Sequence, residues 1–248
     1  AVLYLQADVA LYSGDYETAI TSGNAVIVKA NDAYFTSEGI SNLWAKDSYA
    51  GRIFAFNTHS TYYSNIQFSI QEGDYFCVNP KLNVGTSDLR YTSFTSPFVM
   101  NGTVRTLLGK YNRCNKLNQT TAYINTMRYA GAYYIVAEAY CRKGETEAAR
   151  VLINHYWHCI GVSEAPAGIT NQALLELILT DKQREFVGEG VNFFDLKRTH
   201  LASLPRYSQW GTSASSSISS TDYRWNFPIP VSEYRFNSVE QNAGWPSN

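Results

Sequence analysis

Charge is scarce in this sequence, and the charges that are present almost cancel. Only 17% of the 248 residues are charged, against about a quarter in an average globular protein, and the formal net charge is −1. Proteins that bind nucleic acid carry a strongly basic surface, so the composition argues against that class of partner. No apolar run approaches the ~20 residues that a membrane-spanning helix needs.

Familiar catalytic and metal-binding motifs are also missing. The sequence has no glycine-rich phosphate loop, no serine nucleophile turn and no His-Glu zinc motif. Its four cysteines are irregularly spaced and fit no zinc or redox pattern, so they do not indicate a cellular compartment. They are Cys77, Cys114, Cys141 and Cys159. We therefore expect no catalytic residue, no cofactor and no metal site.

Hydrophobic and aromatic residues, in contrast, are plentiful. They reach 45% and 15% of the chain, which is enough to fold around a substantial core. Tyrosine alone occurs 19 times. Its ring has an apolar face and a polar edge, which suits an adhesive surface in contact with water, although we expect most of these rings to lie in the core.

Two stretches of the sequence have the pattern of a helical hairpin. Residues 1–30 place apolar residues at helical spacing on both sides of a break at Gly14, and the pattern returns around Gly144 within residues 122–160. Aligning the two glycines also aligns Ala7 with Ala137 and Ala19 with Ala149. Small residues let paired helices approach closely, so we predict a mainly α fold built from tetratricopeptide-like hairpins.

The segment between the hairpins, residues 31–121, has a different character. It is rich in Ser, Thr, Asn, Gly and Tyr, and residues 53–56 and 104–108 are typical of short strands. A loop-rich insertion of this length is usually either functional or flexible. Rings can stack on sugars while amides bind hydroxyl groups, although the same residues also build ordinary hairpin packing. The candidate ligand-binding residues are Tyr62, Tyr63, Asn65 and Tyr75.

After the second hairpin, residues 161–248 are predicted to form a long helix, a short helix and a packed tail. Thr170 is a suitable cap for a helix that runs to about Gly188, and residues 193–198 indicate a further short helix. The tail is too rich in proline and asparagine for regular structure. We expect all 248 residues to form a single domain.

Three carboxylates recur every fourth residue on the long helix, at Asp181, Glu185 and Glu189. Paired carboxylates can hydrolyse a glycoside, but such pairs face each other across a cleft and do not follow one helix face. Lys182, Arg184, Lys197 and Arg198 are close by in the sequence, so we favour a charged hydrogen-bond network that ties this helix to the next segment.

A second cluster, His155, His158 and Cys159, combines donor groups that suit zinc. Because no other cluster supplies the remaining ligands at recognisable spacing, we favour a helix end without metal.

The C-terminal half resembles the SusD/RagB family of outer-membrane nutrient-binding lipoproteins. The resemblance is carried by the run from Asp181 to Arg198, with its Arg184-Glu185, Glu189-Gly190 and Phe-Asp-Leu-x-Arg elements, and by the ending 228–245, with Pro-Ile-Pro and Gly-Trp. Residues 128–139 match the helix of the family's last repeat. Weaker matches follow in the right order at Leu43-Trp44, Ile53-Phe54, Asp88-Leu89-Arg90 and Lys110-Tyr111.

The resemblance implies a function at the cell surface. It predicts capture of an extracellular glycan without catalysis, a SusC-like TonB-dependent transporter as partner, and a lipid anchor in the outer membrane. It places Trp44 at a packed aromatic position rather than a ligand site. Members are about twice this length and the first residues already follow a helical pattern, so we expect an N-terminal part, including the lipid-attached cysteine, to be missing.

Two alternatives remain open. A peptide-binding member of the same family would use its loops to bind backbone groups. A tetratricopeptide adaptor would hold a peptide on its concave helix face, which would leave the long insertion unexplained.

Overall fold

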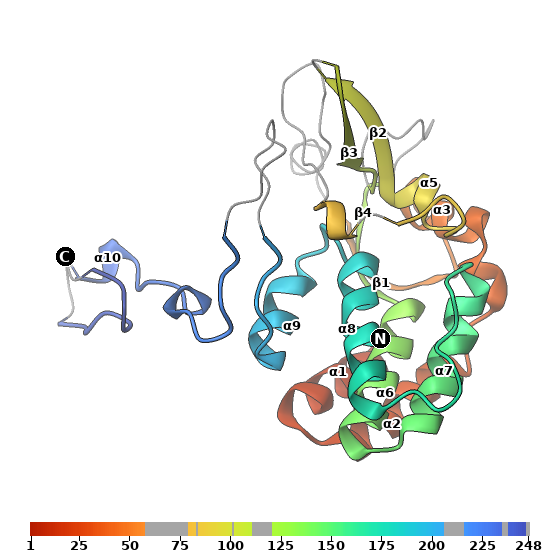
Figure 1. The fold of residues 1–248 in the computed structure, drawn as a ribbon, viewed down its shortest axis with the longest axis horizontal. Coiled ribbons are helices and arrows are strands. Elements are labelled where there is room, and N and C mark those ends of the chain that lie inside the picture. Colours follow the sequence, from red (N-terminus) through yellow and green to blue (C-terminus); the bar gives the residue numbers. More distant parts are fainter. Residues whose placement is uncertain are drawn as a thin grey trace. The chain divides into compact units, whose positions relative to one another are not determined.

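Two helical hairpins form the frame of the protein (Figure 1). In the first, α1 (Val2–Ser13) and α2 (Tyr16–Ile27) are separated by Gly14, whose φ of 82° lies in the left-handed region that glycine adopts readily. In the second, α6 (Tyr129–Lys143) and α7 (Thr146–Cys159) are separated in the same way by Gly144, with a φ of 81°. The aligned alanines Ala7, Ala19, Ala137 and Ala149 are all fully buried. Both predicted hairpins are confirmed.

The central helix is α6, which packs against α1, α2, α7 and α8. Its contact with α2 is close because Gly23 has no side chain: a Cβ built there would lie 2.3 Å from Cγ2 of Val136. Helix α8 (Asn171–Glu185) is capped by Thr170, whose hydroxyl oxygen accepts a hydrogen bond from the N–H of Ala173. The predicted cap is confirmed, and the helix ends three residues before the predicted Gly188.

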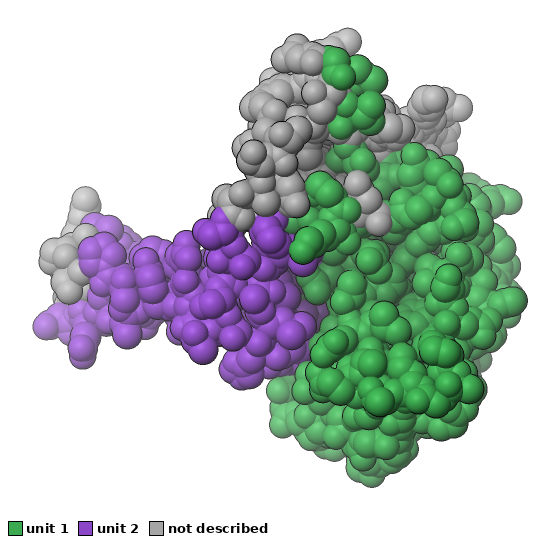
Figure 2. All heavy atoms as spheres, viewed as in Figure 1, with its two compact units in different colours: residues 1–191 green, residues 192–248 purple. Residues whose placement is uncertain are grey.

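The structure describes residues 1–57, 79–82, 84–100, 102–110, 121–205, 216–234 and 238–246. The chain divides into two compact units, Ala1–Val191 and Asn192–Asn248 (Figure 2), so a single domain over all 248 residues stays a prediction. No helix within the described ranges has the length and apolar character to cross a membrane.

Short helices and strands make up the described part of the insertion. They are η1 (Asp32–Phe35), α3 (Ser37–Ala45), β1 (Arg52–Asn57), η3 (Pro80–Leu82), α5 (Tyr91–Phe94), β2 (Thr95–Met100) and β3 (Thr103–Leu108), and β4 (Tyr123–Arg128) follows the insertion. Antiparallel pairing joins β1 to β4 and β2 to β3. Both predicted strands are confirmed, as β1 and β3. The mainly α fold with a strand-containing insertion is therefore the observed one.

Helix α3 was not predicted from its Ser- and Asn-containing sequence. The Thr36 hydroxyl caps it by accepting a hydrogen bond from the N–H of Gly39. Its apolar residues Ile40, Leu43 and Trp44 are buried. Trp44 is fully enclosed, with its ring 6.0 Å from that of Phe94, as expected for a packed aromatic residue.

The second unit contains α9 (Val191–Thr199), which begins at the last residue of the first unit, η4 (Tyr223–Trp225) and α10 (Val231–Tyr234). Aromatic rings hold it together: Phe193 lies 5.4 Å from Trp225 and stacks on Phe227 at 5.1 Å. Within the tail, the side chain of Gln241 accepts from the N–H of Ile229 and donates to its carbonyl. The tail was expected to lack regular structure, and α10 adds one short helical segment to it.

Candidate functional site

The four residues predicted to bind ligand, Tyr62, Tyr63, Asn65 and Tyr75, lie outside the described residues. Their role stays a prediction. The described structure nevertheless fixes the two ends of the segment that contains them, residues 58–78, because β1 ends at Asn57 and the described chain resumes at Asn79.

Strand β1, which leads into this segment, carries two exposed phenyl rings. Phe54 is 38% exposed and Phe56 is 58% exposed, and their rings meet edge to face with 5.0 Å between centroids. Residues two apart on a strand share a face, so both rings point to the same side. The sequence indicated this strand but not the exposure of its rings, which depends on what the folded chain leaves uncovered.

Strand β1 is held in place from the side of α3 as well as by β4. The Arg52 guanidinium donates hydrogen bonds to the carbonyls of Leu43 at 2.9 Å, Lys46 at 3.0 Å and Asp47 at 2.7 Å, at the end of α3. Asn125 on β4 donates to the Leu43 carbonyl at 2.8 Å. The exposed rings therefore stand on a fixed strand.

A buried network of charged side chains ties the insertion to α8. Its members are Asp88, Arg90, Lys110, Arg128, Asp181, Glu185 and Glu189, whose side chains are at most 9% exposed. We call this set the ion network. The carboxylate row forms a charged hydrogen-bond network, as predicted, but the network ties α8 to the insertion and β4 and not to the next segment. Most of its cations come from the insertion and not from Lys182, Arg184, Lys197 or Arg198.

Arg90 stands at the centre of one half of the ion network. Its guanidinium lies 2.7 Å from Asp88, 2.8 Å from Asp181 and 2.9 Å from Glu185. Arg90 immediately precedes α5, so these bonds fix the start of the α5–β2 segment against α8. Charge-assisted hydrogen bonds of this kind are directional and set the orientation of both partners.

Lys110 and Arg128 form the other half. The Lys110 ammonium lies 2.6 Å from a carboxylate oxygen of Glu189 and donates to the carbonyls of Glu185 at 2.6 Å and Val187 at 3.1 Å. Arg128 pairs with both Glu185 and Glu189. Lys110 directly precedes the undescribed segment 111–120, and Arg128 ends the strand that follows it. The ion network thus holds described residues on both sides of segment 111–120.

Neutral donors from the second hairpin complete the ion network. Tyr134 and Trp157 donate to Asp181, the latter at 2.8 Å, and the Tyr156 hydroxyl donates to Glu185 at 2.9 Å. Because these donors come from α6 and α7, the network joins the insertion to the hairpin frame as well as to α8.

The electrostatics of the ion network favour ion pairs over proton transfer. Burial raises the pKa of Glu185, but the charges of Arg128, Arg90 and Lys110 outweigh it and bring the pKa down to about 2. Burial lowers the pKa of Lys110 to about 8, against the attraction of Glu189. A general acid for glycoside hydrolysis needs a raised pKa and access to substrate. Glu185 has neither, so the geometry supports a structural role for it.

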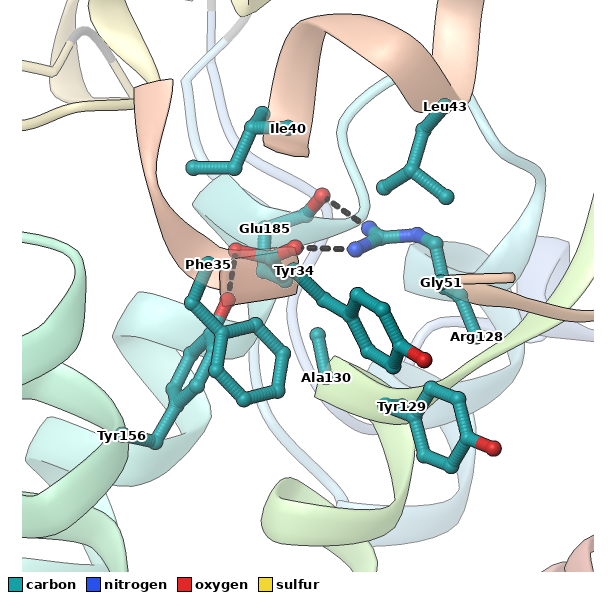
Figure 3. A pocket seen from close by; sticks show the side chains of 10 residues that line it. All are labelled: Tyr34, Phe35, Ile40, Leu43, Gly51, Arg128, Tyr129, Ala130, Tyr156 and Glu185. Carbon is teal, nitrogen blue, oxygen red and sulfur yellow. Dashed lines mark hydrogen bonds and ion pairs between the residues drawn. The ribbon is translucent and has the colours of Figure 1, made fainter. Parts of the chain in front are cut away.

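A shallow pocket lies where the insertion meets the hairpin frame (Figure 3). Tyr34 and Tyr129 stack at 5.5 Å at its edge, with their hydroxyl groups directed away from the Arg128–Glu185 pair. Tyr49 meets Tyr34 edge-on at 5.9 Å, and burial raises the pKa of its hydroxyl. The cavity volume is only about 10 Å³, which is roughly the space that one water molecule needs, so this pocket is too small to enclose a sugar.

Comparison with known proteins identifies a family with this sequence pattern and solved structures with this fold. The sequence model of the SusD family matches residues 51–245. A search of curated proteins finds no match to the sequence. Among solved structures, a SusD superfamily protein from Bacteroides vulgatus ATCC 8482 is 19% identical with a TM-score of 0.72, and the match covers 100% of this chain and 59% of that one.

Two further structures give the same result. A SusD superfamily protein from Bacteroides thetaiotaomicron VPI-5482 is 22% identical with a TM-score of 0.73, covering 98% of this chain and 60% of the other. A SusD-like carbohydrate binding protein from B. vulgatus is 19% identical with a TM-score of 0.70, covering 94% and 57%. The chain spans 57–60% of the length of these three structures. Since the family match extends over most of its residues, the chain belongs to the SusD family.

Proposed function

We propose that this protein captures an extracellular glycan at the outer face of the outer membrane and delivers it, unchanged, to a SusC-like TonB-dependent transporter. It acts as a binding component and not as an enzyme, and it is held at the membrane by a lipid anchor outside this chain. Membership of the SusD family supports this proposal, as does the likeness of its fold to a structure described as a carbohydrate binding protein.

The observation that carries the proposal is the exposed ring pair Phe54–Phe56 on β1. Large apolar side chains that share an exposed face on a fixed strand indicate a contact surface. The edge-to-face arrangement leaves the outer side of the rings free to stack on the C–H face of a sugar. The strand leads directly into residues 58–78, so the rings and the predicted ligand residues Tyr62, Tyr63, Asn65 and Tyr75 would form one surface.

Affinity gel electrophoresis against a panel of soluble polysaccharides tests the proposal. We expect retardation by at least one glycan, and binding at least about tenfold weaker in Phe56→Ala, which equals ~1.4 kcal/mol. Tyr62→Ala and Tyr75→Ala should weaken binding to the same glycan. Phe194→Ala is the matched control, because Phe194 is also an exposed phenyl ring that meets another Phe edge-on, at 5.4 Å, in the second unit.

Two outcomes would contradict the proposed site or ligand. Equal retardation of the wild type, Phe56→Ala and both tyrosine variants would show that these residues do not bind the glycan. Binding to oligopeptides with no retardation by any glycan would favour the peptide-binding alternative. The transporter is tested separately, by co-purification with a co-expressed SusC-like protein from the same genome, and its absence from the purified complex would reject that partner.

A further inference from the structure

Three side chains with different donor atoms meet on one surface of the first unit. They are Asp32 on η1 and His155 and Cys159 on α7, and one potential ligand atom from each lies within 4.8 Å of the others. Nε2 of His155 is 3.2 Å from Oδ1 of Asp32. The side chains of Asp32 and His155 are 66% and 52% exposed, so an ion from solvent can reach them.

The three donors are held by parts of the structure that do not depend on a metal. His155 and Cys159 are four residues apart on a 14-residue helix, which places them on the same face. The His155 ring also stacks on Tyr133, with 6.1 Å between centroids and 26° between planes. Such a contact limits the rotation of the imidazole and directs Nε2 towards Asp32.

The third donor is fixed by the packing of η1. Phe35, at the end of η1, is buried and meets the rings of Tyr133 at 5.6 Å and Tyr156 at 5.1 Å edge-on. The Asn31 side chain caps η1 by accepting from the N–H of Ala33 at 2.9 Å. Asp32 therefore lies beside α7 because the core holds η1 there.

This geometry differs from the cluster visible in the sequence. Nδ1 of His158 lies 3.1 Å from Oε1 of Glu164, so His158 has its own partner and is not a member of the set. The missing ligand is Asp32, 123 residues before His155 in the chain. No local spacing could reveal it, and its absence from the sequence pattern was the reason for expecting no metal.

We propose that Asp32, His155 and Cys159 bind one Zn²⁺ ion, with water as the fourth ligand. Carboxylate oxygen, imidazole nitrogen and thiolate sulfur form a set of intermediate softness that suits zinc and not Ca²⁺ or Mg²⁺. With Zn–N and Zn–S distances of about 2.0 and 2.3 Å, tetrahedral ligand atoms lie about 3.5 Å apart, so only small side-chain rotations are required. The Cys159 thiol loses its proton to solvent as the S–Zn bond forms.

The ion would join η1, at the start of the insertion, to α7 of the second hairpin. Its three donors come from η1 and α7, and β1 supplies none of them. Zinc binding should therefore stabilise the fold without being required for retardation by a glycan.

Co²⁺ absorption and calorimetric titration of Zn²⁺ into the chelator-treated protein test the proposal. In a background with Cys77→Ser and Cys114→Ser, we expect a thiolate-to-Co²⁺ band that one equivalent of Zn²⁺ removes and that Ca²⁺ and Mg²⁺ leave unchanged. His155→Ala and Cys159→Ser should each weaken Zn²⁺ binding at least about tenfold, because even the hydrogen-bonding partners of ligands are worth about 10–100-fold. His158→Ala, on the same helix, should bind as tightly as the parent.

The proposal fails if the Co²⁺ thiolate band is absent, or if Zn²⁺ binds equally well to His155→Ala and the parent. It also fails if His158→Ala weakens binding as much as His155→Ala does. Thermal unfolding in the presence of chelator shows whether each variant folds. Because the His155 side chain is half exposed, His155→Ala is the variant more certain to fold. If Cys159→Ser does not fold, Asp32→Asn takes its place with the same expected loss of affinity.

Discussion

Replacing Glu185 by Gln should destabilise the protein strongly while changing almost no atoms. The Glu185 side chain is 2% exposed and lies between two guanidinium groups, those of Arg90 and Arg128. Glutamine keeps the shape and can still accept the hydrogen bond from Tyr156, but it removes the negative charge. The two arginines would then repel each other in a place that water cannot reach.

Two independent estimates give the same size of effect. Removing one partner of a buried ion pair costs about 3–5 kcal/mol. The environment lowers the pKa of Glu185 from 4.5 to about 2, which corresponds to about 3 kcal/mol of stabilisation of the charged form. We therefore expect Glu185→Gln to lower the free energy of unfolding by about 3 kcal/mol at pH 7.

The pH dependence gives the prediction a second, more specific measurement. Because the pKa of Glu185 is lower in the folded than in the unfolded chain, the unfolded chain binds more protons between pH 4.5 and 2. The stabilisation is complete above pH 4.5 and is lost as the pH falls towards 2. The difference between wild type and Glu185→Gln should accordingly shrink from pH 7 to pH 3.

Urea unfolding followed by far-ultraviolet circular dichroism measures both quantities. Glu147→Gln is the control, because Glu147 also pairs with an arginine, Arg150 at 2.6 Å, but its side chain is 70% exposed. Exposed pairs contribute little, so this variant should unfold close to the wild type. Equal unfolding midpoints for the two variants, or a difference that stays constant down to pH 3, would refute the assignment of this stability to the ion network.

Two further predictions concern stability. Lys110 has a folded-state pKa of about 8 against 10.5 in the unfolded chain, so between these values the unfolded chain binds more protons and stability rises with pH. In urea titrations, the free energy of unfolding of the wild type should therefore rise by about 1 kcal/mol from pH 8 to pH 9 relative to that of Lys110→Met. A constant difference would contradict it. Gly23→Ala should cost about 1–3 kcal/mol, since the new Cβ meets the buried Val136 at 2.3 Å. In a Val136→Ala background, Gly23→Ala should cost less than it does in the wild type, because the smaller side chain relieves the clash. If the two changes in the free energy of unfolding simply add in the double mutant, there is no such clash.

The helical frame could be predicted because its signals are local. A glycine after the first helix, small residues at the contact and a capping threonine before α8 are each readable within a few residues of sequence. Helix α3 was missed because Ser, Gly and Asn are weak helix formers, and it exists because Ile40, Leu43 and Trp44 gain burial. Tertiary packing decided its structure, and no local pattern expresses that packing.

Only part of the candidate site could be predicted from the sequence, for a related reason. The spacing of Asp181, Glu185 and Glu189 predicted a row of carboxylates at the end of α8 and in the turn after it, yet Arg90 and Arg128 lie 95 and 57 residues before Glu185. The ring pair Phe54–Phe56 was visible as part of a strand, but exposure is a property of the whole fold. Spacing within one element can be read from sequence, whereas a partner on another element requires the topology.

The buried charges explain how the described part of the insertion is held in one position. An apolar contact tolerates sliding, whereas a guanidinium held by three carboxylates has one satisfactory orientation, so Arg90 fixes its segment on α8. Arg128 does the same for β4, and β4 pairs with β1, with Arg52 opposite Arg128. The position of the exposed rings on β1 therefore depends on carboxylates of α8 and the turn after it. By this reasoning, the loss of one buried charge in Glu185→Gln should weaken the proposed glycan binding as well as stability, although the Glu185 side chain is buried.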